Sequence, residues 1–298
     1  MNLYQERSRN VFKTWALMLG FFLLVIAVGW AISWYYGSPA ILYGAVIFSV
    51  LMNVGSYWFS DKLVLSMTSA KPATRAEYFD LYTVTENLAI TAGLPMPKLY
   101  VIDDAAPNAF ATGRDEKHAV VVATTGLLAV LDRTELEGVI AHELSHVKNK
   151  DMLVMTVAVV LAGFLAIIAD IFLRMSMFGG GDRDSGKGGA LLAVLAIVGI
   201  ILAPIAAQLI QLAISRRREY LADSSGALLT RYPEGLASAL GKIGSYAAPM
   251  KSANHATAHL FIGNPFGARA SSFTNKLFAT HPPIEDRIQK LLGTTRAE

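Results

Sequence analysis

Four long stretches of the chain are almost entirely apolar, and more polar segments separate them. They are residues 15–36, 40–59, 152–173 and 190–214. Each is close to the roughly 20 residues that cross a bilayer as a helix. The pattern therefore predicts four transmembrane helices, two in an amino-terminal hairpin and two that interrupt a polar region. A hairpin that enters the membrane without crossing it, or one that packs on the domain, would also explain the last two stretches.

Shorter patterns in the polar segments predict a small domain of helices and strands. Residues 75–92 have the apolar spacing of an amphipathic helix, which the glycine that follows should end. Residues 98–102 and 118–123 are rich in β-branched and apolar side chains, and they predict two strands. Between them, residues 107–113 fit either an edge strand, which would pair readily with an extended peptide, or a plain loop.

Residues 135–151 predict a further helix. Thr134 and Glu137 have the spacing of a capping box at its start. Apolar residues follow at intervals of three and four, as expected for the buried face of a helix. They are Leu136, Val139, Ile140 and Leu144.

This helix carries the pattern H-E-x-x-H, formed by His142, Glu143 and His146. Residues four apart share a helix face, so both imidazoles can bind one ion. Zinc suits them, because it takes neutral imidazole nitrogen without redox chemistry. Glu143 would lie beside the metal, where a carboxylate can accept a proton from an attacking water. Histidines that only form hydrogen bonds inside a buried helix are the alternative, but the pair and the glutamate together favour zinc.

A catalytic zinc normally has three protein ligands and one open position. The candidates for the third ligand are His118, His281 and the carboxylates beyond the helix that carries H-E-x-x-H. Among these, Glu219 and Asp223 are four apart and would share a helix face. Glu219 could bind the metal while Asp223 orients a ligand histidine. A surface helix with paired charges would explain these two residues equally well.

The composition agrees with a membrane protein. The chain has 298 residues, of which 53% are hydrophobic and only 16% charged. It has no cysteine, which excludes thiolate zinc ligands, disulfides and a cysteine nucleophile. Three successive arginines, residues 216–218, directly follow an apolar stretch. We interpret them as an anchor at the bilayer surface and expect no nucleic-acid partner.

The positive charges predict the orientation in the membrane. Lysines and arginines flank the apolar stretches at their outer ends, whereas the loop at residues 37–39 has no charge. The positive-inside rule then places both termini and both parts of the metal site in the cytoplasm. The expected organisation is a tail (1–14), a membrane hairpin (15–59), a first catalytic part (60–151), two further spans with a Gly-rich loop at 174–189 (152–214), and a second catalytic part (215–298).

Several motifs in this order resemble the HtpX family of bacterial membrane metalloproteases, which are relatives of the CAAX prenyl proteases. The motifs are H-E-x-x-H, two apolar stretches, R-x-x-E-x-x-A-D at 216–223, the segment 108–113, and His-Pro-Pro at 281–283. The resemblance extends over nearly the whole chain. It implies a mainly α membrane protein with four transmembrane helices and a small α+β, zincin-like (gluzincin) catalytic domain.

The resemblance also implies residue roles. His142, His146 and Glu219 would bind one Zn²⁺ per chain, and Glu143 would be the general base. Asp223 would orient a ligand histidine, Arg216 would steady its helix, and His281 could stabilise the oxyanion. The strand that aligns the substrate would contain Asn108, Ala109 and Phe110.

The implied function is a zinc endopeptidase of the bacterial inner membrane, with its active site facing the cytoplasm. Its substrates would be unfolded or damaged membrane proteins, in quality control linked to stress. The alternatives are a protease for prenylated proteins, an intramembrane zinc protease, and a scaffold with a structural zinc. A scaffold would need a fourth protein ligand, and none is evident in the sequence.

Overall fold

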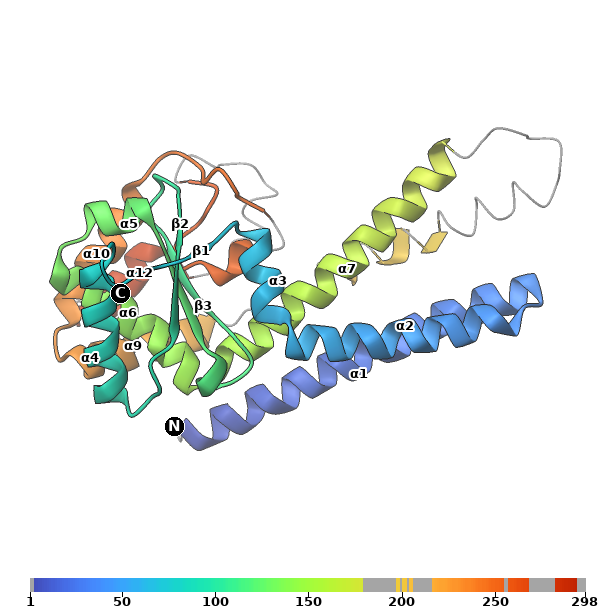
Figure 1. The fold of residues 1–298 in the computed structure, drawn as a ribbon, viewed down its shortest axis with the longest axis horizontal. Coiled ribbons are helices and arrows are strands. Elements are labelled where there is room, and N and C mark those ends of the chain that lie inside the picture. Colours follow the sequence, from blue (N-terminus) through green and yellow to red (C-terminus); the bar gives the residue numbers. More distant parts are fainter. Residues whose placement is uncertain are drawn as a thin grey trace, which may run out of the picture. The chain divides into compact units, whose positions relative to one another are not determined.

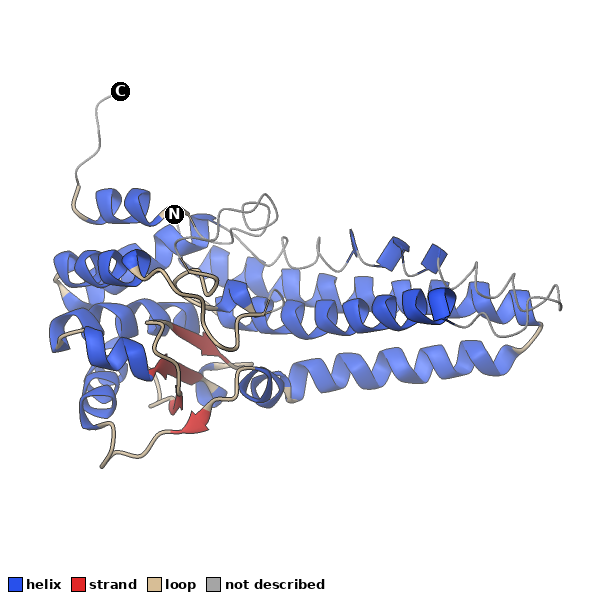
Figure 2. Ribbon diagram, turned by 90° about the horizontal axis from the view of Figure 1, so that it is seen from above, coloured by secondary structure: helices blue, strands red, loops and turns tan. Residues whose placement is uncertain are grey.

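A computed structural model describes residues 3–178, 197–198, 200–202, 204–205, 216–254, 257–267 and 282–293. The chain divides into two compact units. The sheet unit comprises Met1–Lys13, Phe59–Thr156 and Ile214–Glu298, and the helical unit comprises Thr14–Trp58 and Val157–Ala213. Helix predominates over strand throughout, as the colours of Figure 2 show.

The helical unit contains most of α1 (Leu3–Tyr36), all of α2 (Pro39–Trp58) and most of α7 (Asp151–Phe178). These helices contain three segments that are long and apolar enough to cross a membrane: Ser8–Tyr36, Pro39–Trp58 and Asp151–Ile171. They correspond to the first three predicted spans. The fourth, at 190–214, lies mostly outside the described residues, although the short described pieces within it are helical.

The first two spans form an antiparallel hairpin (Figure 1). Gly37 makes the turn with a φ of 62°, a left-handed conformation that favours glycine. Gly29 lets α1 approach α2, because a Cβ atom there would collide with that of Ala45. The side chains that these helices expose are largely apolar, as lipid contact requires. They include Trp15, Leu19, Leu23, Trp30, Trp34, Tyr43, Ile47, Leu51 and Trp58.

A four-stranded mixed sheet forms the centre of the sheet unit (Figure 1). Its strands are β1 (Lys71–Pro72), β2 (Lys98–Ile102), β3 (Ala109–Thr112) and β4 (Val120–Thr124), in the order β1-β2-β4-β3. β2 and β4 are parallel, and the other two pairs are antiparallel. β4 begins two residues later than predicted, because the Asp115 side chain caps the 3₁₀ turn Glu116–His118 just before it. Within the part of the chain that the structure describes, β3 is an edge strand, so the strand and not the loop alternative for 107–113 is correct.

Helices surround this sheet. Ahead of α6 are α3 (Ser60–Met67), α4 (Phe79–Ala92) and α5 (Thr125–Val130). The other described helices of this unit are α6 (Arg133–Lys148), α9 (Arg216–Thr230), α10 (Pro233–Ser245), a 3₁₀ turn (Ala258–Leu260) and α12 (Ile284–Leu291). α4 ends at the left-handed Gly93, as predicted, but begins four residues late, because the chain turns between Thr74 and Tyr78 before entering it.

The predicted capping box of α6 was wrong by two residues. The N-cap is Asp132, whose carboxylate accepts a hydrogen bond from the Glu135 backbone N–H at 2.9 Å. The Glu135 carboxylate in turn accepts from the Asp132 N–H at 2.9 Å. Aspartate is a stronger N-cap than threonine, and it sets the start of the helix. Glu135 also binds Ser238 and Lys242 of α10, which ties the two helices together.

α6 is the central helix of this unit, and it packs against α4, α9, α10 and β3. Its contact with α10 is close because residue 138 is a glycine. A Cβ atom at Gly138 would lie 2.6 Å from the backbone nitrogen of Leu236. A backbone atom of a packed helix cannot move aside as a flexible side chain can.

Gly138→Ala is therefore expected to lower the free energy of unfolding by about 1–3 kcal/mol, the usual cost of overpacking. Gly241→Ala in α10 is the matched control, because the nearest atom to its Cβ would be 4.0 Å away. That control should be neutral or stabilise by up to about 1 kcal/mol, from better helix propensity. Thermal unfolding of both variants in detergent tests this, and equal stabilities would contradict the packing argument.

Candidate metal centre

Two imidazoles from α6 form one side of the site. His142 and His146 are buried, with exposed fractions of 1% and 6%. They lie one helical turn apart, and their Nε2 atoms are 3.1 Å from one another. The H-E-x-x-H spacing thus brings two nitrogen ligands to one point, as the sequence predicted.

Helix α9 supplies the third candidate ligand. Gly226 lets it lie against α6, because a Cβ atom there would be only 3.0 Å from the backbone nitrogen of His142. Two turns earlier on α9, the buried Glu219 carboxylate reaches both imidazoles. Its oxygens are 3.8 Å from His142 Nε2 and 3.6 Å from His146 Nε2. Among the described residues, the metal-ligating groups that converge here are His142, His146 and Glu219, and we call them the metal triad.

The separations within the metal triad fit a tetrahedral zinc ion. Bonds of 2.0–2.1 Å at tetrahedral angles would place donor atoms roughly 3.3 Å apart. The observed donor separations run from 3.1 to 3.8 Å. Two nitrogens and one carboxylate are also a donor set found in catalytic zinc sites that keep a position open. The centre is therefore a metal-binding site with the chemistry of a zincin.

Asp223 contacts the imidazole of His142 at the nitrogen that does not face the triad, and Arg287 holds Asp223 in turn. The Asp223 carboxylate lies 2.9 Å from His142 Nδ1, so Nε2 is left to face the triad. The fully buried Arg287 donates two hydrogen bonds to this carboxylate, at 2.7 and 2.9 Å. Burial alone would raise the pKa of Asp223, but the charge of Arg287 and the bonds to His142 and Arg287 hold that pKa below its ordinary value.

Sequence reasoning missed Arg287, although a signal was present. It lies at the i+3 position of an apolar stripe on α12 that also contains Ile284, Ile288 and Leu291. A charged residue inside a buried stripe indicates a buried partner. What the sequence does not show is that the partner is Asp223, 64 residues earlier in the chain.

Asp151 supports the second imidazole in the same way, and it was also missed. Its Oδ2 lies 3.2 Å from His146 Nδ1. Asp151 is the first residue of α7, and the left-handed Lys150 (φ 57°) turns the chain between the two helices. The short H-x-x-x-x-D spacing was visible in the sequence. Helical periodicity did not connect the two residues, because α6 ends at Lys148.

Glu143 is buried beside the triad, with an exposed fraction of 2%. Burial raises the pKa of its carboxyl group to about 7, and the nearby charge of Glu219 adds to this. The charges of His146 and Arg287 oppose the rise, and so does a hydrogen bond from the backbone N–H of Ala111. This bond places the carboxylate of Glu143 at the outer edge of β3.

The two histidines have opposite pKa shifts. Burial lowers the pKa of His142 to about 4, against the opposing effect of Asp223. Burial acts in the same direction on His146. The hydrogen bond to Asp151 and the charges of Glu219, Asp151 and Glu143 nevertheless raise its pKa to about 9. Without a metal, His142 is therefore neutral at neutral pH, whereas His146 carries an additional proton and a positive charge.

The other predicted site residues lie in different surroundings. His118 is exposed and bonds to Asp115 and Arg114, away from the triad. Arg216 is exposed at the start of α9, whereas Arg218, two residues later, is buried. His281 lies outside the described residues.

The segment predicted to align a substrate is in contact with another part of the chain. The Ala109 carbonyl accepts a hydrogen bond from the Ile262 N–H at 2.9 Å. The Asn108 side chain binds both backbone groups of Gly263, each at 3.0 Å. The ring of Phe110 packs edge-on against Phe261, with centroids 5.0 Å apart. Main-chain and amide contacts from residues 261–263 therefore occupy part of the outer edge of β3.

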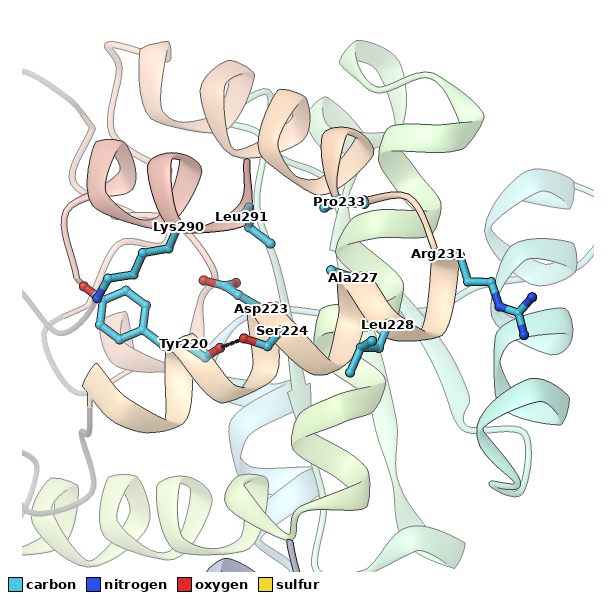
Figure 3. Close-up of a pocket in the computed structure, with 9 residues that line it drawn as sticks. All are labelled: Tyr220, Asp223, Ser224, Ala227, Leu228, Arg231, Pro233, Lys290 and Leu291. Carbon is cyan, nitrogen blue, oxygen red and sulfur yellow. Dashed lines mark hydrogen bonds between the residues drawn. The ribbon is translucent and has the colours of Figure 1, made fainter. Parts of the chain in front are cut away.

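A pocket of about 490 Å³ lies on the other side of α9 (Figure 3). Asp223 and Leu291 point into it, and the Lys290 ammonium lies 3.3 Å from the centre of the Tyr220 ring. Of the described residues that line it, Asp223 is the one that also contacts a triad histidine. The pocket thus borders the support of the metal centre and not the triad itself.

Comparisons with known proteins agree with this site. The model of Peptidase family M48 matches residues 76–295. A protease HtpX homolog of Caldanaerobacter subterraneus subsp. tengcongensis is 48% identical, with 98% of both chains covered. One of Thermococcus sibiricus is also 48% identical, with 94% of both chains covered. The crystal structure of S. mikatae Ste24p has a TM-score of 0.53, covers 97% of this chain and 67% of its own, and is 19% identical, so it shows a shared fold alone.

Metal binding is expected to strengthen as the pH rises. The raised pKa of His146 means that a proton occupies this ligand at neutral pH in the metal-free protein. A metal must displace that proton. For one displaced proton, the affinity for the metal should increase by about tenfold per pH unit until the pH approaches the pKa of His146. Chelator competition for zinc at about pH 6 and about pH 8 measures this effect. Equal affinities at the two pH values would contradict it.

Proposed function

The chain belongs to Peptidase family M48 and is a membrane metalloprotease, the activity that its resemblance to the HtpX family predicted, and we propose that it is a zinc endopeptidase of the bacterial inner membrane. We propose that it cleaves misfolded or damaged membrane proteins at the cytoplasmic face of that membrane. The observation that carries the proposal is the buried Glu143 beside the metal triad. A structural zinc would have no use for an additional buried carboxylate at that place.

A zinc ion held by the triad would polarise the scissile carbonyl and activate water at neutral pH. Glu143 accepts the proton of the attacking water and delivers it to the leaving amine. Its raised pKa suits a group that must both take and give a proton near neutral pH. Asp223 and Asp151 hold the imidazoles in the tautomer that presents Nε2 to the metal.

We propose that Asn108, Ala109 and Phe110 align the substrate as an added strand. β3 is at the sheet edge, and Ala111 of the same strand contacts Glu143. Pairing along this edge uses hydrogen bonds to the substrate's main chain, so it tolerates many side-chain sequences. Such tolerance suits a protease for unfolded chains. Ile262 and Gly263 already bind part of the edge, so a substrate strand competes with them for Asn108 and Ala109.

The membrane-protein substrates are proposed from the connection between site and spans. His146 precedes the third apolar stretch by only six residues, and Glu219 follows the fourth by five. At 1.5 Å per helical residue, this corresponds to roughly 10 Å of chain on each side. A protease whose ligands adjoin two apolar stretches meets substrates at the bilayer surface. A role in stress-linked quality control is the function of HtpX-like proteases that the family resemblance implies.

Glu143→Gln should lower kcat by about 10²–10⁴-fold, the usual contribution of a general base, while leaving zinc binding intact. The amide has nearly the same size but cannot accept the proton. We would purify the wild type and the variant in detergent with zinc, follow cleavage of an unfolded membrane protein, and measure bound metal. Full activity in the variant would remove Glu143 from the mechanism.

Glu219→Ala is the informative companion variant. It removes one of the three ligands and should lose zinc as well as activity. The two variants together separate the chemistry from metal retention. If Glu219→Ala kept its zinc, the third ligand would have to be another residue.

The orientation can be tested with single cysteines, because the chain has none of its own. Ser38→Cys lies in the turn between α1 and α2, and Ser245→Cys is exposed at the end of α10. In spheroplasts, a membrane-impermeant maleimide should label Ser38→Cys and leave Ser245→Cys unlabelled until the membrane is opened. The reverse pattern would place the metal centre on the outer face and overturn the cytoplasmic assignment.

A further inference from the structure

The buried carboxylate of Asp151 is held by groups from outside its own helix. The Asn10 side chain donates a hydrogen bond to its Oδ1 at 2.5 Å, and Arg218 Nε lies 3.8 Å from the same oxygen. Its other oxygen, Oδ2, faces His146 Nδ1. The two carboxylate oxygens of Asp151 therefore have different partners. Oδ1 contacts Asn10 and Arg218, and Oδ2 contacts the metal ligand His146.

Asn10 is the centre of this support. It lies on α1 ahead of the first apolar stretch, belongs to the sheet unit, and is 1% exposed. Its Nδ2 also donates to the carbonyl of Asn149, the C-cap of α6, at 3.1 Å. Its Oδ1 accepts from Arg218 of α9 at 3.4 Å. One amide thus joins the end of α6, the start of α7 and the start of α9.

These contacts all converge on the groups around His146. A buried carboxylate without fixed partners could rotate, and it would then hold the imidazole less firmly. Partners that orient a metal ligand from behind typically contribute 10–100-fold to metal affinity. Asn10 acts one step further out, because it fixes the partner itself.

We propose that Asn10 is a positioning residue of the metal centre. It locks the Asp151 carboxylate so that His146 presents Nε2 to the metal. The amino-terminal helix α1 is therefore part of the metal site as well as a membrane anchor. Metal affinity then depends on a residue near the start of α1, more than 130 residues away from the ligands in sequence.

The alternative is that Asn10 only fills space between helices. Two substitutions of Asn10 distinguish these roles, because each role predicts a different one to weaken zinc binding more. Asn10→Leu keeps the volume but removes every hydrogen bond, whereas Asn10→Ser is smaller but keeps a hydroxyl donor. If Asn10 positions Asp151, Leu should weaken zinc binding more than Ser. If Asn10 fills space, Ser should be the more damaging change.

The experiment measures zinc affinity of the full-length protein in detergent by competition with a chromogenic chelator. We expect Asn10→Leu to weaken zinc binding by about tenfold, the low end of the range for outer partners of a metal ligand. Asn53→Leu is the matched control: it removes a similar amide that bonds within α2, to the Ser49 carbonyl, and it should leave zinc affinity unchanged. The thermal midpoint of each metal-free variant shows whether it remains folded.

A double-mutant cycle tests the route of the effect. Asp151→Asn should itself weaken zinc binding by about 10–100-fold. In that background, Asn10→Leu should cost little more, because the group that it positions is already altered. Losses that simply add, or a zinc affinity of Asn10→Leu equal to that of the wild type, would overturn the proposal.

Discussion

The close approach of α9 to α6 is the constraint on which the metal centre depends. Gly226 brings the two backbones together beside His142, and this contact places Glu219 opposite both imidazoles. A larger residue at 226 would separate the helices by a few tenths of an ångström or more, because a backbone nitrogen is the nearest obstacle. A metal with bonds of about 2 Å tolerates little such displacement.

Burial of so many ionisable groups is possible because each has a partner. Each triad histidine is held at Nδ1 by a carboxylate, and each carboxylate is faced by a buried arginine. Charges in a protein interior are costly unless they are paired and hydrogen-bonded. The pairing also leaves Nε2 of both imidazoles directed at the same point, which is what a metal requires. Charge compensation and ligand orientation are thus achieved by the same side chains.

The membrane segments and the metal centre are connected through the chain itself. α7 begins with Asp151, which contacts His146, and α1 begins with the turns that contain Asn10. The helices that contain these apolar segments therefore also carry residues that contact a metal ligand or its partner. This arrangement offers a route by which the first helix affects the metal centre.

The sequence by itself determined the features that depend on local periodicity. It placed His142 and His146 on one helix face, paired Glu219 with Asp223, located β2, and marked three apolar helices that the structure contains. Only the tertiary structure decided which residues complete the centre. Arg287 meets Asp223 across 64 residues, and Asn10 meets Asp151 across 141. Spacings of two, three or four residues say which side chains share a face, but packing decides which faces meet, and that depends on the whole chain at once.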